Sequence, residues 1–405
     1  MKKFIAVQLG ARRAYAVPSI LEKAGMLETF YTDLCGNAGI LGSLMNSLPN
    51  SLIKGQLKNL YGRQLPNNLI HKTVTFPYLT LQYEIEKKLS QCGEDKLRAF
   101  VKLANKMGDS ITNNGLGEAT HLFTMFGEGM PLVRFAKQSG LTTITEIFIL
   151  WSAHNIIEQE RQLFSDLEQP LDSYYSKDAQ ESGKQWQQEL LKLSDWTIAP
   201  SEAVRQDQKT NFGYCSDRCF VVPYAVDDSW FQIQSNPIPK RILFVGTADL
   251  RKGIHYLGMA AEKLKSRGYE FRVAGSVSEK ICQHSITESL TFLGRVPRSQ
   301  IKQEYASADI FVLPSLAEGS AEATYEALAS GLPVITTSAS GSVVRNNIEG
   351  FIVPERDPTV LAERIEELVE NRQLRDRMAL AAKDRAKGYT WEQYAKRLLT
   401  VFETI

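Results

Sequence analysis

The sequence predicts an α/β protein with two domains, each built around a parallel sheet. Three observations support this prediction. The length of 405 residues exceeds what one hydrophobic core usually supports. Near the start, a strand at 4–7, a helix at about 15–24 and a strand at 30–32 follow one another, and this βαβ order implies parallel pairing. A linker with two prolines at 234–240 then precedes a new strand and a second βα series.

The composition is that of an ordinary soluble globular protein, with 43% hydrophobic and 23% charged residues. A formal net charge of +1 gives no reason to expect nucleic acid as a partner. Because the sequence has neither a signal-peptide pattern nor an apolar run of ~20 residues, we expect a cytoplasmic protein. The five cysteines are scattered, and Cys215 and Cys219 lack further ligands nearby, so reduced thiols are expected in place of zinc.

The first half offers several candidates for a cleft, because binding usually occurs at the carboxyl ends of parallel strands. Gly10, Arg12 and Arg13 follow the first strand; the two arginines either meet an anionic group or are solvated surface residues. Glu146 lies near the end of a strand predicted at 141–149, where a carboxylate needs a partner or a cleft. His154 follows this strand. A surface or hydrogen-bonded histidine is a simpler interpretation of this residue than a catalytic histidine.

Residues 34–83 contain no Asp or Glu but carry four cations and many leucines. One interpretation is a peripheral contact of 41–72 with an anionic membrane or a lipid-linked acceptor. The other is a helical insertion at about 34–119 whose apolar residues are packed. An amphipathic helix predicted at about 94–113 is explained by core packing.

The second half is organised around residues 311–334, whose pattern is strand, loop, helix, glycine stop and strand. Glu318 lies in the loop, and Glu326 lies in a helix predicted at 322–329. Because a helix N-terminus can receive a phosphate, two carboxylates beside it suit the hydroxyl groups of a nucleotide sugar. Arg251 and Lys252 precede another helix and either neutralise a pyrophosphate or form a solvated pair.

These motifs occur in a characteristic series: FVG…KG, AG, FLGRV, YASADIFVLPS, EG…E, SGLPVI and GFIVP. The series resembles the nucleotide-binding half of the family 4 retaining glycosyltransferases, and Glu318 and Glu326 match that family's E-x7-E signature. The resemblance is strong from 241 to about 369 and extends back through DWTIAPSEAVR and CFVVPYAVD. It implies the GT-B fold, in which two Rossmann-like domains face each other across a cleft.

On this resemblance the chain divides into three parts. Residues 1–235 form the acceptor-side domain with the helical insertion, residues 236–385 form the nucleotide-sugar domain, and residues 386–405 form a helix that crosses back to the first domain. Domain closure would then complete the site.

The resemblance also implies roles for individual residues. Lys252, helped by Arg251, would contact the donor diphosphate, Glu318 the donor sugar and Glu326 the ribose. The remaining implied donor-site residues are Val296 beside the nucleobase, Gly246 and Thr247 in the first loop, and the turn Gly319, Ser320, Ala321, Glu322 and Ala323.

Three of these positions depart from the family's usual residues. Thr247 stands where arginine is frequent, Ala321 where glycine is usual, and Glu322 where an apolar residue is usual. Because alanine restricts φ more than glycine does, the Ala321 position raises the question of strain in the turn. These changes bear on the donor sugar more than on the nucleotide.

The implied activity is retaining transfer of a hexose from a UDP-sugar or GDP-sugar to a hydroxyl of a glycan, lipid-linked or small-molecule acceptor. It would require neither a metal nor a cofactor, the nucleotide sugar being a substrate. The alternatives are another GT-B enzyme, such as a sugar-nucleotide epimerase, or a non-catalytic nucleotide-sugar binder.

Overall fold

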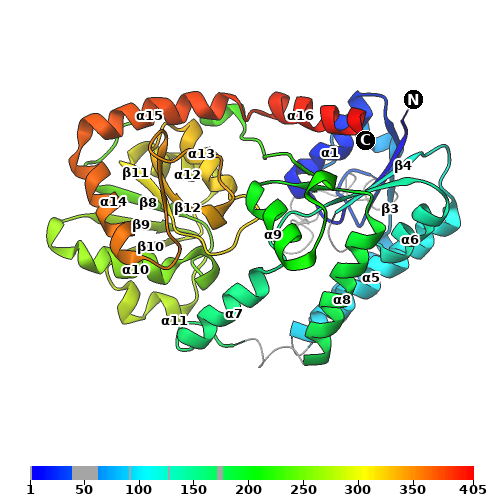
Figure 1. Ribbon diagram of the computed structural model, residues 1–405, viewed down its shortest axis with the longest axis horizontal. Coiled ribbons are helices and arrows are strands. Elements are labelled where there is room, and N and C mark those ends of the chain that lie inside the picture. The colour runs from blue at the N-terminus through cyan, green and yellow to red at the C-terminus, as the bar shows by residue number, and fades with distance from the viewer. Residues whose placement is uncertain (1, 39–62, 91–92, 126–127, 171–176) are drawn as a thin grey trace, which may run out of the picture.

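The computed structural model describes residues 2–38, 63–90, 93–125, 128–170 and 177–405. It contains two parallel sheets side by side, each flanked by helices, and both chain ends lie at the first half (Figure 1). The predicted α/β architecture of two parallel-sheet domains is therefore confirmed.

The first half is built on a seven-stranded parallel sheet in the order β3-β2-β1-β4-β5-β6-β7. In chain order its strands are β1 (Phe4–Val7), β2 (Leu27–Thr32), β3 (Thr73–Thr75), β4 (His121–Met125), β5 (Thr142–Glu146), β6 (Trp196–Ala199) and β7 (Cys219–Val221). The strand order reverses between β1 and β4, so a crevice is expected beyond the carboxyl ends of these two strands.

The second half repeats this design with six parallel strands in the order β10-β9-β8-β11-β12-β13. Its strands are β8 (Arg241–Val245), β9 (Glu270–Ala274), β10 (Leu290–Gly294), β11 (Ile310–Leu313), β12 (Val334–Thr337) and β13 (Gly350–Val353). Its order reverses between β8 and β11. All four β11 residues are fully buried, as expected for a central parallel strand covered on both faces.

The helices connect these strands and cover the sheets. In the first half they are α1 (Ala16–Lys23), α4 (Pro77–Leu89), α5 (Gly93–Asn114), α6 (Met130–Gln138), α7 (Ala153–Leu163), α8 (Lys177–Leu193) and α9 (Glu202–Phe212). In the second they are α10 (Ile254–Lys263), α11 (Glu279–Cys282), α12 (Arg298–Ser307), α13 (Glu322–Ala329), α14 (Pro358–Glu370) and α15 (Arg372–Lys387), followed by α16 (Trp391–Thr404).

Local sequence explains several helix starts. Ser201 caps α9 by accepting the Val204 N–H, as its place before the helix predicted. Asp357 caps α14 through two backbone N–H groups, with Pro358 at the first helical position. The helix predicted at 322–329 is confirmed as α13.

Two expectations about the first half need correction. The strand predicted at 141–149 ends at Glu146, because Phe148 leaves the sheet and its carbonyl lies against Gly319 of the second half. The segment predicted as a helical insertion also contributes an edge strand, β3, which pairs with β2. Most of the stretch 41–72, the predicted membrane contact, lies outside the described residues.

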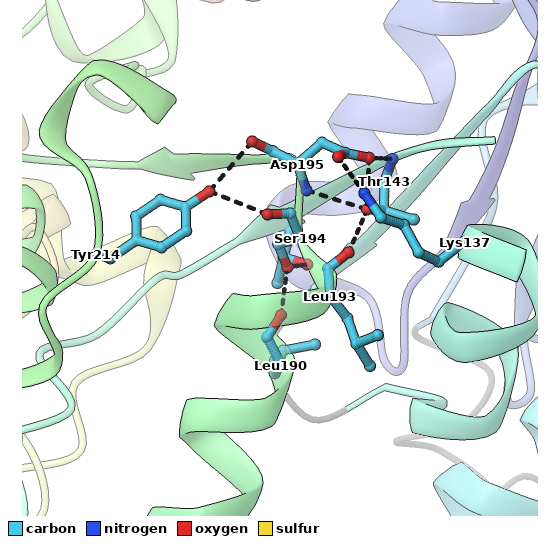
Figure 2. Close-up of polar contacts among 8 residues, drawn as sticks. Lys137, Thr143, Leu190, Leu193, Ser194, Asp195 and Tyr214 are labelled. Atoms are coloured by element: carbon cyan, nitrogen blue, oxygen red, sulfur yellow. Dashed lines mark hydrogen bonds and ion pairs between the residues drawn. The ribbon is translucent and has the colours of Figure 1, made fainter. Parts of the chain in front are cut away.

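A polar network fixes the amino-terminal ends of β5 and β6 to the end of α8 (Figure 2). Asp195 accepts the Thr143 N–H at 3.0 Å and also pairs with Lys137 of α6. The Thr143 hydroxyl donates to the Leu193 carbonyl at 2.5 Å. The Tyr214 hydroxyl donates to the backbone carbonyl of Ser194 at 3.2 Å. These bonds hold the edge of the sheet opposite to the carboxyl ends.

The last helix, α16, ties the end of the chain to the first half (Figure 1). The Phe402 ring lies 4.8 Å from the Phe4 ring and 6.0 Å from the Phe123 ring, between centroids. Tyr394 and Leu398 are buried on the same helix. The apolar face expected for this segment therefore packs where the resemblance implied.

Candidate functional site

The candidate site of the second half forms where its strand order reverses. β8 and β11 are hydrogen-bonded neighbours, so the loops that follow them leave the same edge of the sheet side by side. The loop after β8 carries Arg251 and Lys252, and the loop after β11 carries Glu318.

The loop after β8 forms a tight turn, Leu250–Lys252, that is capped at both ends. Asp249 accepts the Lys252 N–H at 2.9 Å, and Gly253 ends the turn with φ +70°. A Cβ at Gly253 would lie 2.1 Å from the Pro314 carbonyl oxygen. Glycine is therefore needed twice at this position, for its backbone conformation and for the close approach of the loop after β11.

Three charged groups converge in front of these two loops. Oε1 of Glu318 lies 2.5 Å from Nζ of Lys252 and 2.6 Å from Nη1 of Arg251. The Lys252 side chain crosses Gly246, where a Cβ would come within 2.9 Å of its Cδ and Cε. Thr247 lies beside this group, its hydroxyl 3.4 Å from that of Ser276. The predicted catalytic residues are thus brought together with one net positive charge.

The turn after Glu318 is pressed against the first half. A Cβ at Gly319 would lie 1.6 Å from the Phe148 carbonyl oxygen, so no other residue fits there without separating the halves. The Gly319 carbonyl accepts a hydrogen bond of 2.5 Å from the Ser201 hydroxyl of α9. The predicted donor turn is therefore also a contact between the two halves.

The rest of this turn is held by hydrogen bonds from within the second half. The Ser320 hydroxyl donates to the Gly341 carbonyl at 2.9 Å and lies 2.8 Å from the Tyr325 hydroxyl. Ala321 precedes α13 with φ −78°, an ordinary conformation for any residue. Alanine in place of glycine therefore causes no backbone strain at this position.

Helix α13 presents its two acids to a cavity of about 830 Å³. Glu322 is exposed in the first turn, Ala323 is half-buried beside it, and Glu326 lies one turn further on. The Tyr305 hydroxyl donates to Oε2 of Glu326 at 2.9 Å. Burial raises the pKa of the Glu326 carboxyl to about 7, and the nearby charge of Glu322 adds to the increase.

Both halves of the protein line this cavity. Its walls come from the loop after β1, the segment after β7, α12, α13 and the start of α16: Ala11, Arg13, Ala14, Gln64, Ala225, Val226, Asp227, Ser229, Trp230, Arg298, Ser299, Lys302, Glu322, Glu326 and Trp391. Val296 does not line it; this half-buried side chain packs against the core next to α12. The cavity therefore joins Glu326 of the second half to the loop after β1 in the first half.

The candidate residues of the first half lie in different surroundings. Glu146, at the end of β5, pairs through both oxygens with Nη2 of Arg13, at 2.5 and 2.6 Å. The Gly10 N–H donates to Oδ1 of Asp33 at 2.9 Å, and the Arg12 guanidinium lies 3.9 Å from the Phe148 ring centroid. His154 is exposed on α7 and is not part of the cavity wall.

Arg13 belongs to a strained segment at the cavity wall. Arg13, Ala14 and Tyr15 have φ values of 48°, 50° and 60°, three consecutive left-handed residues with side chains. Each costs on the order of 1–2 kcal/mol relative to a right-handed conformation. The buried pair with Glu146, and the Tyr224 ring 4.3 Å from the guanidinium, fix this conformation. The sequence left open whether Arg13 is solvated; the structure places it in a buried ion pair.

Sequence reasoning also missed several residues at the cavity. Arg298 and Lys302 both face it from α12, and their i,i+4 spacing was a usable signal. Trp391 lines the cavity from the start of α16, and buried Tyr305 holds Glu326 from behind it. Both lie within segments that the sequence singled out, but nothing local indicated these positions.

In the described part of the chain, no group of three or more His, Cys, Asp or Glu side chains could hold a metal ion. Nor is any helix there long and apolar enough to cross a membrane.

Comparisons with known proteins agree with this geometry. Residues 227–385 match the family model described as glycosyl transferases group 1. The chain is 31% identical over 174 residues to the uncharacterized glycosyltransferase MJ1607 of Methanocaldococcus jannaschii, covering 40% of this chain and 45% of that one. It is 30% identical over 201 residues to the capsular polysaccharide biosynthesis glycosyltransferase CapM of Staphylococcus aureus, covering 44% of this chain and 50% of CapM. The chain thus spans half or less of the length of these relatives.

Among solved structures, the chain resembles HepE of Anabaena, crystallised in complex with UDP and glucose. The TM-score is 0.61 at 13% identity, and the likeness covers 100% of both chains. A likeness at this identity is informative about the fold. Residues 227–385 therefore match the group 1 glycosyl transferases, and the whole chain has the GT-B fold.

Proposed function

We propose that this protein transfers a hexose from a nucleoside-diphosphate sugar to an acceptor hydroxyl, with retention at the anomeric carbon. The observation that carries the proposal is the convergence of Arg251 and Lys252 on Glu318 beside α13, whose Glu326 faces the cavity. The match of this half to the group 1 glycosyl transferases supports it.

Each charged group then has a role in holding the donor. The diphosphate would displace Glu318 from Lys252 and Arg251, because these cations and the nearby start of α13 suit an anion. Glu318, released from the ion pairs, would accept hydrogen bonds from sugar hydroxyls. Glu326 would accept them from the ribose hydroxyls through the cavity.

The same groups would promote departure of the nucleoside diphosphate. Lys252 and Arg251 would stabilise the negative charge that develops on the leaving diphosphate, a role that needs no metal ion. Glu318 and Glu326 lie in one half of the protein, on a single loop and helix, and so do not flank a scissile bond as a glycosidase pair does. The acceptor would enter along the cavity wall supplied by Arg13 of the first half and by Trp391 of α16.

The relatives suggest classes of donor and acceptor. HepE was crystallised with UDP and glucose, and CapM acts in capsular polysaccharide biosynthesis. We therefore propose a UDP-sugar or GDP-sugar as donor, and a hydroxyl of a growing polysaccharide or glycolipid as acceptor.

A thermal-shift panel of UDP, GDP and ADP, each with its sugars, tests the donor proposal. A ligand present at 100 times its Kd stabilises the protein by about 2.7 kcal/mol, so the correct nucleotide will raise the Tm. Incubation with the donor alone then separates transfer from epimerisation, because an epimerase needs no acceptor. If no nucleotide of the panel raises the Tm, the proposal fails.

We also propose a peripheral contact with anionic lipid through 41–72 and the outer face of α4, at the inner face of the membrane. On α4, Tyr78, Leu81, Ile85 and Leu89 are 77%, 61%, 51% and 75% exposed, an apolar stripe at helical spacing. Such a stripe next to a sequence stretch with lysines and no acids suits an anionic surface.

Liposome flotation tests this contact. The protein should float with anionic vesicles at low salt, and the double variant Leu81→Ser, Ile85→Ser should float less. Leu380→Ser, which changes a leucine on α15 that is more exposed than either of these residues, is the control and should float as the unaltered protein does. Failure to float at low salt would contradict the proposal.

A further inference from the structure

Helix α7 follows β5 in the first half, yet its carboxy-terminal end is anchored to the second half. The Phe164 ring lies 4.6 Å from the His255 ring and 6.1 Å from the Tyr256 ring, between centroids. Beyond the helix, Asp166 pairs with His284 at 2.8 Å. Figure 1 shows α7 extending between the two halves toward α11.

A buried carboxylate forms the centre of this anchor. Glu160 is completely buried; its Oε2 accepts a hydrogen bond from the Tyr256 hydroxyl at 2.9 Å and lies 3.1 Å from Nε2 of His255. Its other oxygen pairs with Arg356. A buried carboxylate is tolerated only with such partners, so this anchor is specific as well as apolar.

The segment continues to Glu168, which reaches the turn that carries the two cations. Oε1 of Glu168 accepts the Leu250 N–H at 2.8 Å, at the first residue of the turn Leu250–Lys252. Glu168 is itself held by Arg161, whose Nε lies 3.3 Å from Oε2. The turn thus has two acidic caps: Asp249 for the Lys252 N–H and Glu168 for the Leu250 N–H.

We propose that Glu168 is a positioning residue for the donor diphosphate. It belongs to the first-half segment after β5 but fixes the start of the Leu250–Lys252 turn, which sets where Arg251 and Lys252 point. Because α7 is anchored through Glu160 and Phe164, Glu168 stays on this turn when the two halves move. This inference rests on the proposed function only for the identity of the anion.

The first test needs no ligand and compares Glu168→Ala, Glu168→Gln and Gln159→Ala in the full chain. Hydrogen exchange resolved at the Leu250 amide should become roughly tenfold faster or more in Glu168→Ala, because its acceptor is lost. Glu168→Gln retains an acceptor oxygen and should exchange within about twofold of the unaltered protein. Gln159→Ala, at an exposed position of α7, should leave exchange unchanged.

The second test separates positioning from a general structural effect. The affinities of the preferred nucleoside diphosphate and of the corresponding nucleoside are measured by calorimetry for the same variants. Glu168→Ala should bind the diphosphate about tenfold more weakly or worse and the nucleoside as before, and Glu168→Gln should restore diphosphate binding.

Unchanged exchange at Leu250 in Glu168→Ala would overturn the inference, as would an equal loss of affinity for diphosphate and nucleoside. If the unaltered protein binds no nucleoside diphosphate, the proposed function fails. In that case, hydrogen exchange at the Leu250 amide in the Glu168 variants still decides whether Glu168 holds the Leu250–Lys252 turn.

Discussion

Glu326→Gln separates the contribution of this side chain to folding from its contribution to binding. Glutamine has nearly the same shape and still offers an oxygen to the Tyr305 hydroxyl, which donates to Glu326 at 2.9 Å. It removes only the ionised form, which burial disfavours. Burial raises the pKa of the Glu326 carboxyl from 4.5 to about 7. At neutral pH the ionised form of this carboxyl is therefore less stable in the folded protein than it would be in water.

The size and sign of the effect follow from linkage. A folded-state pKa near 7 against 4.5 in the unfolded chain corresponds to about 3 kcal/mol. The protonated form stabilises the fold, so this stability is fully present below pH 4.5 and is lost as the pH rises through 7. Glutamine mimics the protonated form. At pH 8 the variant should be more stable by about 3 kcal/mol, and at pH 5 by less than about 1 kcal/mol.

The measurement is thermal unfolding without nucleotide at pH 5 and pH 8. At about 2–4 °C per kcal/mol, the variant should unfold about 6–12 °C higher at pH 8, and the difference should be much smaller at pH 5. Glu363→Gln, at an exposed carboxylate on α14, is the control and should show no such pH-dependent difference. An equal Tm difference at both pH values would refute the claim that burial controls this group.

Binding should change in the opposite direction to stability. If the ionised Glu326 accepts hydrogen bonds from the ribose, the variant should bind the nucleotide about tenfold more weakly at pH 8. The unaltered protein should itself bind more weakly as the pH falls below 7, because Glu326 becomes protonated. Unchanged affinity of the variant in calorimetry would rule out the ribose role.

Three further substitutions test other parts of the site. Lys252→Ala should lower the rate of sugar transfer by about 10²–10³-fold while circular dichroism shows an intact fold. A near-normal transfer rate would contradict the role proposed for Lys252. Gly319→Ala should separate the two halves, because the new Cβ would meet the Phe148 carbonyl; an unchanged radius of gyration in solution scattering and unchanged turnover would contradict this. Glu146→Gln should cost about 3–5 kcal/mol in urea unfolding by leaving buried Arg13 without its carboxylate, and a loss below 1 kcal/mol would mean that the pair is not needed.

Much of the fold was predictable because local sequence encodes it. The strand at β8, the glycine stop after α13 and the cap at Ser201 follow from apolar runs, glycine and proline positions and side-chain capping. Strands were less predictable where tertiary contacts decide their ends. β5 stops at Glu146 because Phe148 meets the other half, and no local pattern in 141–149 indicates that contact.

For the site, the sequence by itself determined which residue types could hold a nucleotide sugar: two cations before one helix, and two acids around the start of another. Only the tertiary structure decided that Lys252 meets Glu318, because that contact depends on β8 and β11 being neighbours. The same holds for the pairing of Arg13 with Glu146 across the first sheet. It also holds for Glu168, which reaches the Leu250–Lys252 turn from the segment after α7 of the other half. The physical reason is that strand order and the docking of the halves bring distant segments together, whereas periodicity and capping act within a few residues.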